Sequence, residues 1–156
     1  MARLFDPVSF MNETVPANAT KRIPRPVGEP VGIVTALDWK SGQVKKPGPS
    51  LGSDWFRLDV KLEVTDPEYI AQCVGNQSGK ELFTYGIMYD AQDDGRPKIG
   101  ENVNVALGKF RDACNANGKP YAMCIGQPLK LQVIQKPHPT NPNDPPLDEV
   151  YSVSRP

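Results

Sequence analysis

The stretch ENVNVALGKFRDACNANG, residues 101–118, decides the expected fold because it is the one segment with a clear helical period. Its apolar residues recur at intervals of three and four, which places them along one face of a helix. They are Val103, Ala106, Leu107, Phe110, Ala113 and Cys114. The polar residues between them lie off that face, so the stretch predicts an amphipathic helix packed against the rest of the chain.

The two ends of this helix are also predicted. Asn102 is the expected N-cap, because its side-chain oxygen can accept hydrogen bonds from free N–H groups in the first turn. Asn117 and Gly118 can adopt the left-handed conformation that ends a helix, and Pro120 prevents its resumption. Gly108 costs about 1 kcal/mol relative to alanine in a helix interior. We therefore expect another backbone to approach the helix closely at Gly108.

Length and composition indicate a single, mostly β domain. A chain of 156 residues can bury a substantial core. Its 17 prolines and 13 glycines predict long loops and many turns. The 18 basic and 18 acidic residues cancel, so net charge does not indicate a strongly basic nucleic-acid binder. Only a local basic patch could serve that role.

The cysteines and the hydropathy pattern exclude several classes of protein. Cys73, Cys114 and Cys124 contain no C-x-x-C pair, which matches neither a disulfide framework nor a zinc site. Cys114 lies on the helical face and is predicted to be a buried, small apolar residue. The sequence contains no run of 18 apolar residues, so it predicts no membrane-spanning helix. The N-terminus lacks an apolar signal core. The predicted location is the cytosol.

Five segments outside the helix read as strands. The clearest is DWFRLDVKLEV, in which apolar and polar residues alternate, so that one face is core and the other faces solvent or ligand. Gly32 and Gly86 predict bends or bulges in two of the strands. A short helical turn is expected after Asp66 and Pro67. The predicted strands are residues 30–38, 54–64, 80–90, 128–135 and 147–154.

The order of these elements predicts an OB-fold-like architecture. Three strands, a helix and two further strands are the connectivity of that five-stranded, partly open barrel, in which the helix closes the bottom. A helix packed on an open antiparallel sheet has the same order and remains the alternative. Residues 1–29 have little apolar content and four prolines, so they are expected to form an extended arm. Residues 30–156 form the predicted mostly β (α+β) barrel domain.

No combination of residues indicates an enzyme. His138, flanked by Pro137 and Pro139, has no base partner nearby in sequence, and no nucleophile motif occurs. The acidic residues before Gly95 lack the spacing of a calcium loop, and no phosphate-binding loop is present. The sequence therefore predicts no catalytic residue, no metal, no cofactor and no small-molecule substrate.

Aromatic and basic residues gather around the first two strands. Residues 39–61 contain five basic and two acidic residues, although the whole chain has zero net charge. Single-strand binding without sequence preference uses such a mixture, because rings stack on bases and cations follow the phosphates. OB-folds bind oligonucleotides on strands two and three and in two loops, here residues 40–53 and 136–146. Rim packing of the tryptophans is the alternative. The candidate nucleic-acid-binding residues are Trp39, Lys40, Lys45, Lys46, Trp55, Arg57, Lys61, Tyr85 and Tyr89.

Six segments that together cover most of the chain form a recognisable arrangement. They are LFDPVSF, ANATKRIPRPVGEPVGIV, LFTYGIMYD, GENVNVALGKFRDACNANGKPY, GQPLKLQV and DEVYSVSRP. Their arrangement resembles a group of small bacteriophage proteins, some of them grouped with phage single-stranded-DNA-binding proteins of OB-fold type. The most specific part is the N-V-x-L-G-x-x-R-x-A pattern at residues 104–113. The chain lacks the long acidic tail of bacterial single-strand binders, which puts tail-mediated recruitment of replication proteins in doubt.

Two functions of different classes follow. The first is a phage-encoded protein that binds single-stranded DNA during replication or recombination in the cytoplasm of the infected host. The second is a structural protein of the virion, a capsid decoration or connector subunit that contacts its neighbours through the arm. An inhibitor or adaptor of a host protein would leave no mark in the sequence. Self-association, through the arm or an exposed strand edge, is expected in either case.

Overall fold

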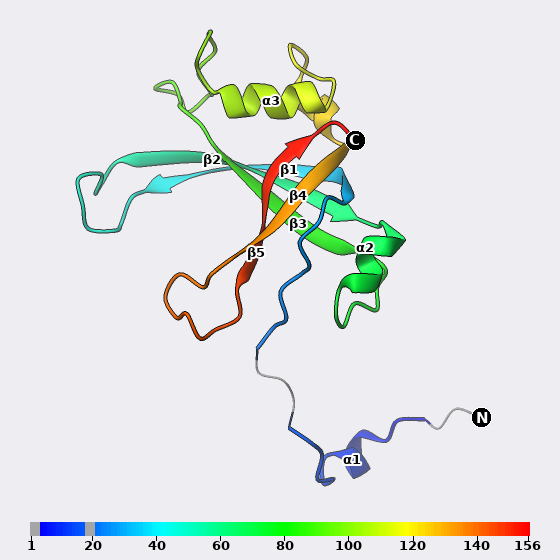
Figure 1. The fold of residues 1–156 in the computed structure, drawn as a ribbon. Helices are drawn as coiled ribbons and strands as arrows, with labels where there is room; N and C mark the ends of the chain where they lie inside the picture. The colour runs from blue at the N-terminus through cyan, green and yellow to red at the C-terminus, as the bar shows by residue number, and fades with distance from the viewer. Residues whose placement is uncertain (1–3, 18–20) are drawn as a thin grey trace.

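The computed structural model describes residues 4–17 and 21–156. The helices and strands follow in this order: α1 (Pro7–Phe10), β1 (Val31–Gln43), β2 (Asp54–Val64), α2 (Pro67–Gln72), β3 (Glu81–Met88), α3 (Val105–Ala113), the 3-10 helix η1 (Tyr121–Cys124), β4 (Pro128–Lys136) and β5 (Leu147–Ser154). The strands form one antiparallel, five-stranded sheet in the order β3-β2-β1-β4-β5 (Figure 1). The mostly β class is therefore confirmed, and β2 and β5 have the predicted bounds.

The first strand is longer than predicted. β1 continues past residue 38 because its partner β2 supplies hydrogen bonds as far as the pair Gln43 and Asp54. Near its start, β1 also pairs with β4, so it joins the two halves of the sheet. The register with β2 shifts between Val34 and Ala36, whereas Gly32 pairs with Val64 without a shift, so the bulge predicted at Gly32 is absent from this ladder. The loop after β1 is correspondingly shorter than the predicted residues 40–53.

The core lies on one face of the strongly curled sheet. Leu58, Val60, Leu62 and Val64 are all at most 1% exposed, which confirms the alternation predicted for β2. β4 contributes Leu129, Leu131 and Val133 to the same core. α3 contacts β3 and β5 and lies across one end of the sheet (Figure 1). The helix buries Leu107, Phe110 and Ala113, followed by Cys114 at its C-cap.

α3 is shorter than the predicted helix at both ends. Asn102 and Asn104 have positive φ angles of 53° and 55°, so the chain turns there, and Asn102 is not the N-cap. The Asn104 amide bonds the backbone N–H of Asp90 at 2.7 Å and its carbonyl at 2.9 Å, which ties the helix start to the end of β3. At the other end α3 stops at Ala113, and Asn115 takes the left-handed position after it with φ 55°. Gly118 is left-handed as predicted, with φ 78°, but it lies beyond the helix end. Ala106, predicted to be core, is exposed.

No backbone approaches Gly108 within the described part of the chain. A Cβ atom built there meets no atom within 4 Å, so the close approach predicted from the sequence is wrong for a single copy of the chain. Gly108 therefore retains the backbone freedom that makes glycine costly in a helix, with no packing contact from its own chain to compensate.

Gly108→Ala is expected to raise the free energy of unfolding by about 1 kcal/mol, because it restores helix propensity without a clash. Urea denaturation of the two proteins measures this difference. Ala106→Gly, at an exposed position of the same helix, serves as the matched control and should lower stability by a similar amount. A destabilised Gly108→Ala protein would contradict the open environment of Gly108.

Residues 21–29 are not detached from the domain. Gly28 exchanges two backbone hydrogen bonds with Val133 of β4, at 3.3 and 2.8 Å. The Tyr69 hydroxyl of α2 donates to the Pro26 carbonyl at 2.8 Å. Arg25 bonds Asp148 of β5, stacks on the Phe83 ring of β3 at 3.6 Å, and donates to the Leu82 carbonyl. This segment therefore lies along the sheet and joins its two outer strands.

The sheet is not closed by backbone hydrogen bonds. In residues 4–17 and 21–156 no ladder joins β3 to β5, and Arg25 links these two edges through its side chain instead. A partly open arrangement of this kind has the predicted strand and helix order, with α3 between β3 and β4. The short helical turn predicted after Asp66 is α2, and the Asp66 carboxylate accepts from Glu68 N–H at 3.1 Å.

Candidate nucleic-acid interface

Strand pairing divides the candidate residues between the two faces of the sheet. Residues directly opposite each other in an antiparallel pair share a face. Lys40 lies opposite Arg57, so these residues share the outer face, which Trp55 and Lys61 occupy by alternation along β2. Trp39 lies opposite Leu58, which is core, and Tyr85 lies opposite Val60, also core. The structure therefore does not bring the candidate residues onto one surface.

On the outer face, one acidic side chain forms ion pairs with two of the candidate cations. Asp59 is 4% exposed and lies 2.7 Å from the Arg57 Nε and 3.1 Å from the Lys40 Nζ. Burial opposes ionisation of Asp59, but hydrogen bonds from Arg57 and Lys40 outweigh it and hold the carboxyl pKa below its usual value. The hydrogen bond to Asp59 in turn raises the pKa of Lys40. Lys40 and Arg57 are therefore already partnered on this face.

Two glycines shape the outer face. Gly42 lies beneath the indole ring of Trp55, where a Cβ atom would come within 2.7 Å of the ring. A Cβ atom at Gly86 would meet the Arg57 Cδ at 3.1 Å, so the glycine leaves room for the Arg57 side chain to cross β3. The pairing of β2 with β3 shows no register shift at Gly86, and the bulge predicted there is absent from this ladder. Trp55 is therefore held against its own sheet.

The remaining lysines are available to an anionic ligand. Lys61 Nζ lies 3.2 Å from the Thr84 hydroxyl, on the outer face. Lys45 and Lys46 are exposed in the loop between β1 and β2. Within the described ranges none of these three side chains forms an ion pair, so each can contact a phosphate without first leaving a carboxylate.

Aromatic side chains gather on the other face, at the free end of the sheet. The Trp39 ring packs edge-on against Tyr89 at 5.5 Å and against Tyr121 at 5.0 Å, and Tyr89 packs against Phe56 at 5.7 Å. These aromatic residues and residues 94–97 surround a hollow of about 350 Å³. Its lining residues include Trp39, Lys40, Phe56 and Tyr89. We call it the aromatic hollow. Trp39 is 41% exposed, so one part of its ring is free for a ligand.

Charged residues lie beside the aromatic hollow. Lys40 is among its lining residues, but the Lys40 ammonium group is held by Asp59 on the outer face. Arg96 lines the hollow with Asp94, whose carboxylate lies 3.4 Å from the Arg96 Nε. The Arg96 side chain is 82% exposed, so this pair is open to water and to competing anions. Nearby, the Arg111 guanidinium stacks on the Tyr121 ring at 4.3 Å. The hollow thus combines stacking surfaces with cations, the mixture that single-strand binding uses.

Several residues of this surface were not predicted from the sequence. Phe56 was expected to be core because of the alternation along β2, and it lines the hollow because it lies at the strand end. Tyr121, Arg96 and Arg111 belong to segments without a strand pattern. Tertiary packing brings Tyr121 and Arg96 to Trp39, and Arg111 stacks on Tyr121. Tyr121 and Arg96 each lie next to a proline, and no periodic pattern in the sequence marks them as part of a site.

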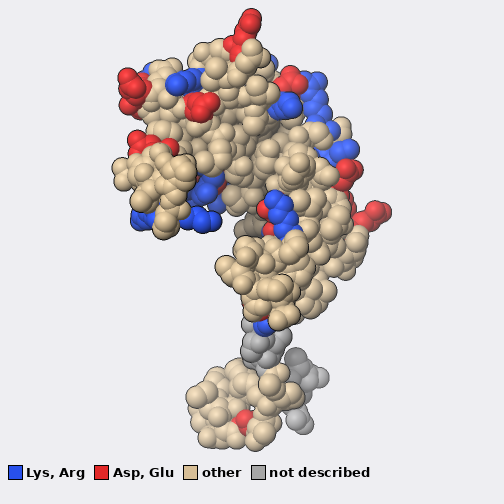
Figure 2. All heavy atoms as spheres, turned by 60° about the vertical axis from the view of Figure 1, so that its left-hand side comes forward, with Lys and Arg blue, Asp and Glu red and all other residues tan. Residues whose placement is uncertain are grey.

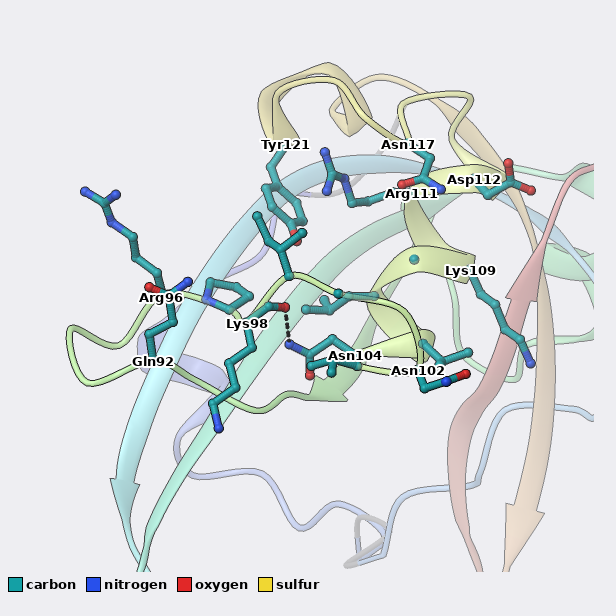
Figure 3. Close-up of a pocket in the computed structure, with 17 residues that line it drawn as sticks. Gln92, Arg96, Lys98, Asn102, Asn104, Lys109, Arg111, Asp112, Asn117 and Tyr121 are labelled. Carbon is teal, nitrogen blue, oxygen red and sulfur yellow. Dashed lines mark hydrogen bonds between the residues drawn. The ribbon is translucent and has the colours of Figure 1, made fainter.

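A larger pocket lies between α3 and the link that precedes it. It has a volume of about 720 Å³ and is lined by residues of the 92–105 segment, α3, Asn117 and Tyr121. Figure 3 shows the Asn104 amide turned toward the Lys98 carbonyl, which it bonds at 3.1 Å. Four basic residues, Arg96, Lys98, Lys109 and Arg111, and one acidic residue, Asp112, are among those that line it, and Figure 3 shows the Arg96, Lys98 and Lys109 side chains extending outward. We call it the α3 pocket.

The single histidine of the chain has a structural role. The His138 Nδ1 accepts hydrogen bonds from the backbone N–H groups of Thr140 and Asn141 at 3.3 and 3.1 Å, and these bonds hold the loop that contains it.

In the described residues no cluster of His, Cys, Asp and Glu could hold a metal ion. All three cysteines are buried as free thiols, as predicted for Cys114. No helix among these residues is long and apolar enough to cross a membrane.

The surface carries both signs of charge. Figure 2 shows lysine and arginine interspersed with aspartate and glutamate on the face that it presents. This agrees with the zero net charge of the chain, so any attraction of a polyanion has to come from local groups such as those at the aromatic hollow. No protein-family model, no curated protein and no solved structure matches this chain.

Proposed function

We propose that this protein binds single-stranded DNA without sequence preference. The observation that carries the proposal is the aromatic hollow, where the partly exposed Trp39 ring and Tyr89 share the lining with Arg96. A base stacked on an aromatic ring contributes about 1–3 kcal/mol, and every base offers such a face. The unpaired Lys45, Lys46 and Lys61 supply further cations for the sugar-phosphate backbone.

The proposed binding mode uses the two faces of the β1–β2 hairpin differently. On the core face, a base enters the aromatic hollow and stacks on Trp39, while its phosphates meet Arg96. On the outer face, the strand follows Lys61 and Trp55, and its phosphates compete with Asp59 for Lys40 and Arg57. Because those two cations are already paired, we expect them to contribute less than the free lysines.

We further propose that the sheet is a partly open OB-fold barrel and that the protein acts in phage replication or recombination, in the cytoplasm of the infected host. The strand order, the position of α3 between β3 and β4, and the Arg25 bridge between the outer strands support the barrel. The resemblance to phage single-stranded-DNA-binding proteins supports the setting. In an OB-fold the ligand lies on strands two and three and in two loops, and of the candidate residues Trp55, Arg57 and Lys61 lie on β2 and Lys45 and Lys46 in the loop before it.

Trp39→Ala is expected to raise the Kd for fluorescent oligo-dT by a factor of about 5 to 150, the loss of one stacking contact. The measurement is a fluorescence anisotropy titration at low salt. Tyr151→Ala serves as the matched control, because Tyr151 is a 61% exposed aromatic residue on β5 outside the hollow. Equal affinities of the Trp39→Ala and Tyr151→Ala proteins would remove the aromatic hollow from the proposal.

A second function is favoured by one specific observation. The apolar side chains of residues 4–17 are largely exposed, which suits an arm that reaches over a neighbouring subunit. We therefore keep a capsid decoration or connector subunit of a virion as the alternative. Quantitative mass spectrometry of purified particles tests it: a stoichiometric amount of the protein would support the structural function, and its absence from particles would count against it.

A further inference from the structure

The N-terminal arm, residues 4–17, exposes apolar side chains that need a partner. Leu4 is 96% exposed, Val8 77% and Met11 82%. Every hydrogen bond and ring contact of these described residues joins two members of the arm itself. Contiguous exposed apolar side chains mark interaction surfaces in soluble proteins. The arm is therefore built for contact with something other than its own domain.

The arm already has a defined local shape. The Asp6 carboxylate caps α1, accepting from Val8 N–H at 3.1 Å and Ser9 N–H at 3.4 Å. The rings of Phe5 and Phe10 pack at 5.3 Å across α1. The arm contains two acidic residues, Asp6 and Glu13, and no basic one. A partner surface should accordingly be hollow, partly apolar and basic.

The α3 pocket has these properties. Its apolar lining includes the 93% exposed Ile99, the 54% exposed Val105 and the buried Leu107. Its basic residues outnumber its acidic ones, and the single acidic side chain, Asp112, is partnered by the Arg155 guanidinium at 3.2 Å. The pocket is thus complementary to the arm in both charge and polarity.

Gly108 makes the pocket receptive to a second backbone. It lines the α3 pocket, and a Cβ atom there would point into open space. A glycine in a helix interior is typical of places where another backbone approaches closely, yet no segment of the described chain does so. A backbone segment from another molecule would supply the close neighbour that Gly108 lacks within its own chain.

We propose that the arm of one copy docks in the α3 pocket of a second copy. Figure 1 shows the arm projecting beyond the end of the sheet opposite to α3, so the pocket of another molecule is the natural receptor. Because arm and pocket are different surfaces, the contact is heterologous and generates a ring or an open filament. This inference does not rest on the proposed DNA binding, and either can fail without the other.

Two complementary variants test the docking. The first lacks residues 1–17 and keeps the pocket; its domain should fold, because the described residues of the arm give it no hydrogen bond or ring contact. The second is the full chain with Gly108→Leu, which adds a bulky side chain to the pocket at a position where a Cβ atom meets no atom within 4 Å. Sedimentation velocity over a range of concentrations should show self-association of the wild-type chain and monomers for each variant alone.

The mixture of the two variants gives the decisive result. The arm of the Gly108→Leu chain can enter the open pocket of the truncated chain, so the mixture should form a 1:1 complex that does not grow further. Full-chain Ala106→Leu, at an exposed position of α3 outside the α3 pocket, is the control and should associate like wild type. The 1:1 complex should weaken as salt rises, because charge complementarity contributes to it.

Three outcomes would overturn the inference. A wild-type chain that stays monomeric at every concentration would show that the arm has another partner. Self-association of the truncated chain equal to that of wild type would assign assembly to another surface. Equal binding of a fluorescent peptide of residues 4–17 to the truncated chain with and without Gly108→Leu would place the receptor outside the α3 pocket.

Discussion

Replacement of Arg25 with alanine is expected to lower the free energy of unfolding by about 3–5 kcal/mol, the cost of breaking a buried ion pair by removing one partner. The Arg25 side chain is 13% exposed and lies between β3 and β5, where it bonds Asp148 at 2.7 Å and stacks on Phe83. The substitution leaves Asp148 without its cation and removes the only side chain described as bonding both outer strands.

Chemical denaturation of the Arg25→Ala protein measures this loss, with Arg22→Ala as the control, because Arg22 is exposed three residues away. A loss no larger for Arg25→Ala than for Arg22→Ala would contradict the bridging role of Arg25. An intermediate loss for Arg25→Lys is expected, since an ammonium group keeps the charge but not the forked geometry.

The effect of Arg25 should depend on pH. Burial of Asp148 opposes its ionisation, but hydrogen bonds from the Arg25 side chain and backbone outweigh burial and lower the carboxyl pKa. A lowered carboxyl pKa stabilises the folded state above the unfolded pKa of about 3.9, and this contribution disappears as the pH falls through the folded value. The stability difference between wild type and Arg25→Ala should therefore shrink below about pH 4.

Phe110→Ala is expected to lower the free energy of unfolding by about 3–5 kcal/mol, the usual cost of removing a buried aromatic ring. Phe110 is 1% exposed and is among the largest fully buried side chains, at the interface of α3 with the sheet. Since α3 also forms one wall of the α3 pocket, its loosening should disturb the pocket as well.

Urea denaturation checks the Phe110→Ala prediction against Lys109→Ala, an exposed substitution in the same helix. The control should change stability by less than about 0.5 kcal/mol, as is usual for surface positions. If both substitutions cost the same, α3 does not seal the core, and its amphipathic period has been misinterpreted.

The sequence predicted the elements where a single periodicity governs them. The alternation along DWFRLDVKLEV reports burial of one face, and the structure buries Leu58, Val60 and Leu62 as expected. The helix was predicted too long because its first residues satisfy the apolar period, whereas Asn102 and Asn104 adopt left-handed backbone conformations. Hydrogen bonds between the Asn104 side chain and the backbone of Asp90 fix the start of the helix at Asn104. Asp90 lies fourteen residues earlier, so no local sequence pattern encodes this contact.

The candidate site was harder to predict because it depends on register. Which face Trp39 occupies is fixed by the length of β1 and by the shift between Val34 and Ala36, and a shift of one residue exchanges the two faces. The pairing of Lys40 and Arg57 with Asp59 depends on the same register. Arg25 gave no signal either, since its partners Asp148 and Phe83 lie far along the chain.

The most direct test of the proposed function is a titration of fluorescent oligo-dT with the full chain at a series of salt concentrations. We expect binding at low salt whose log association constant falls linearly with log salt, with a slope of about 0.7 per phosphate contacted. A protein that is folded by circular dichroism and binds no single strand at the lowest salt concentration would contradict the proposal.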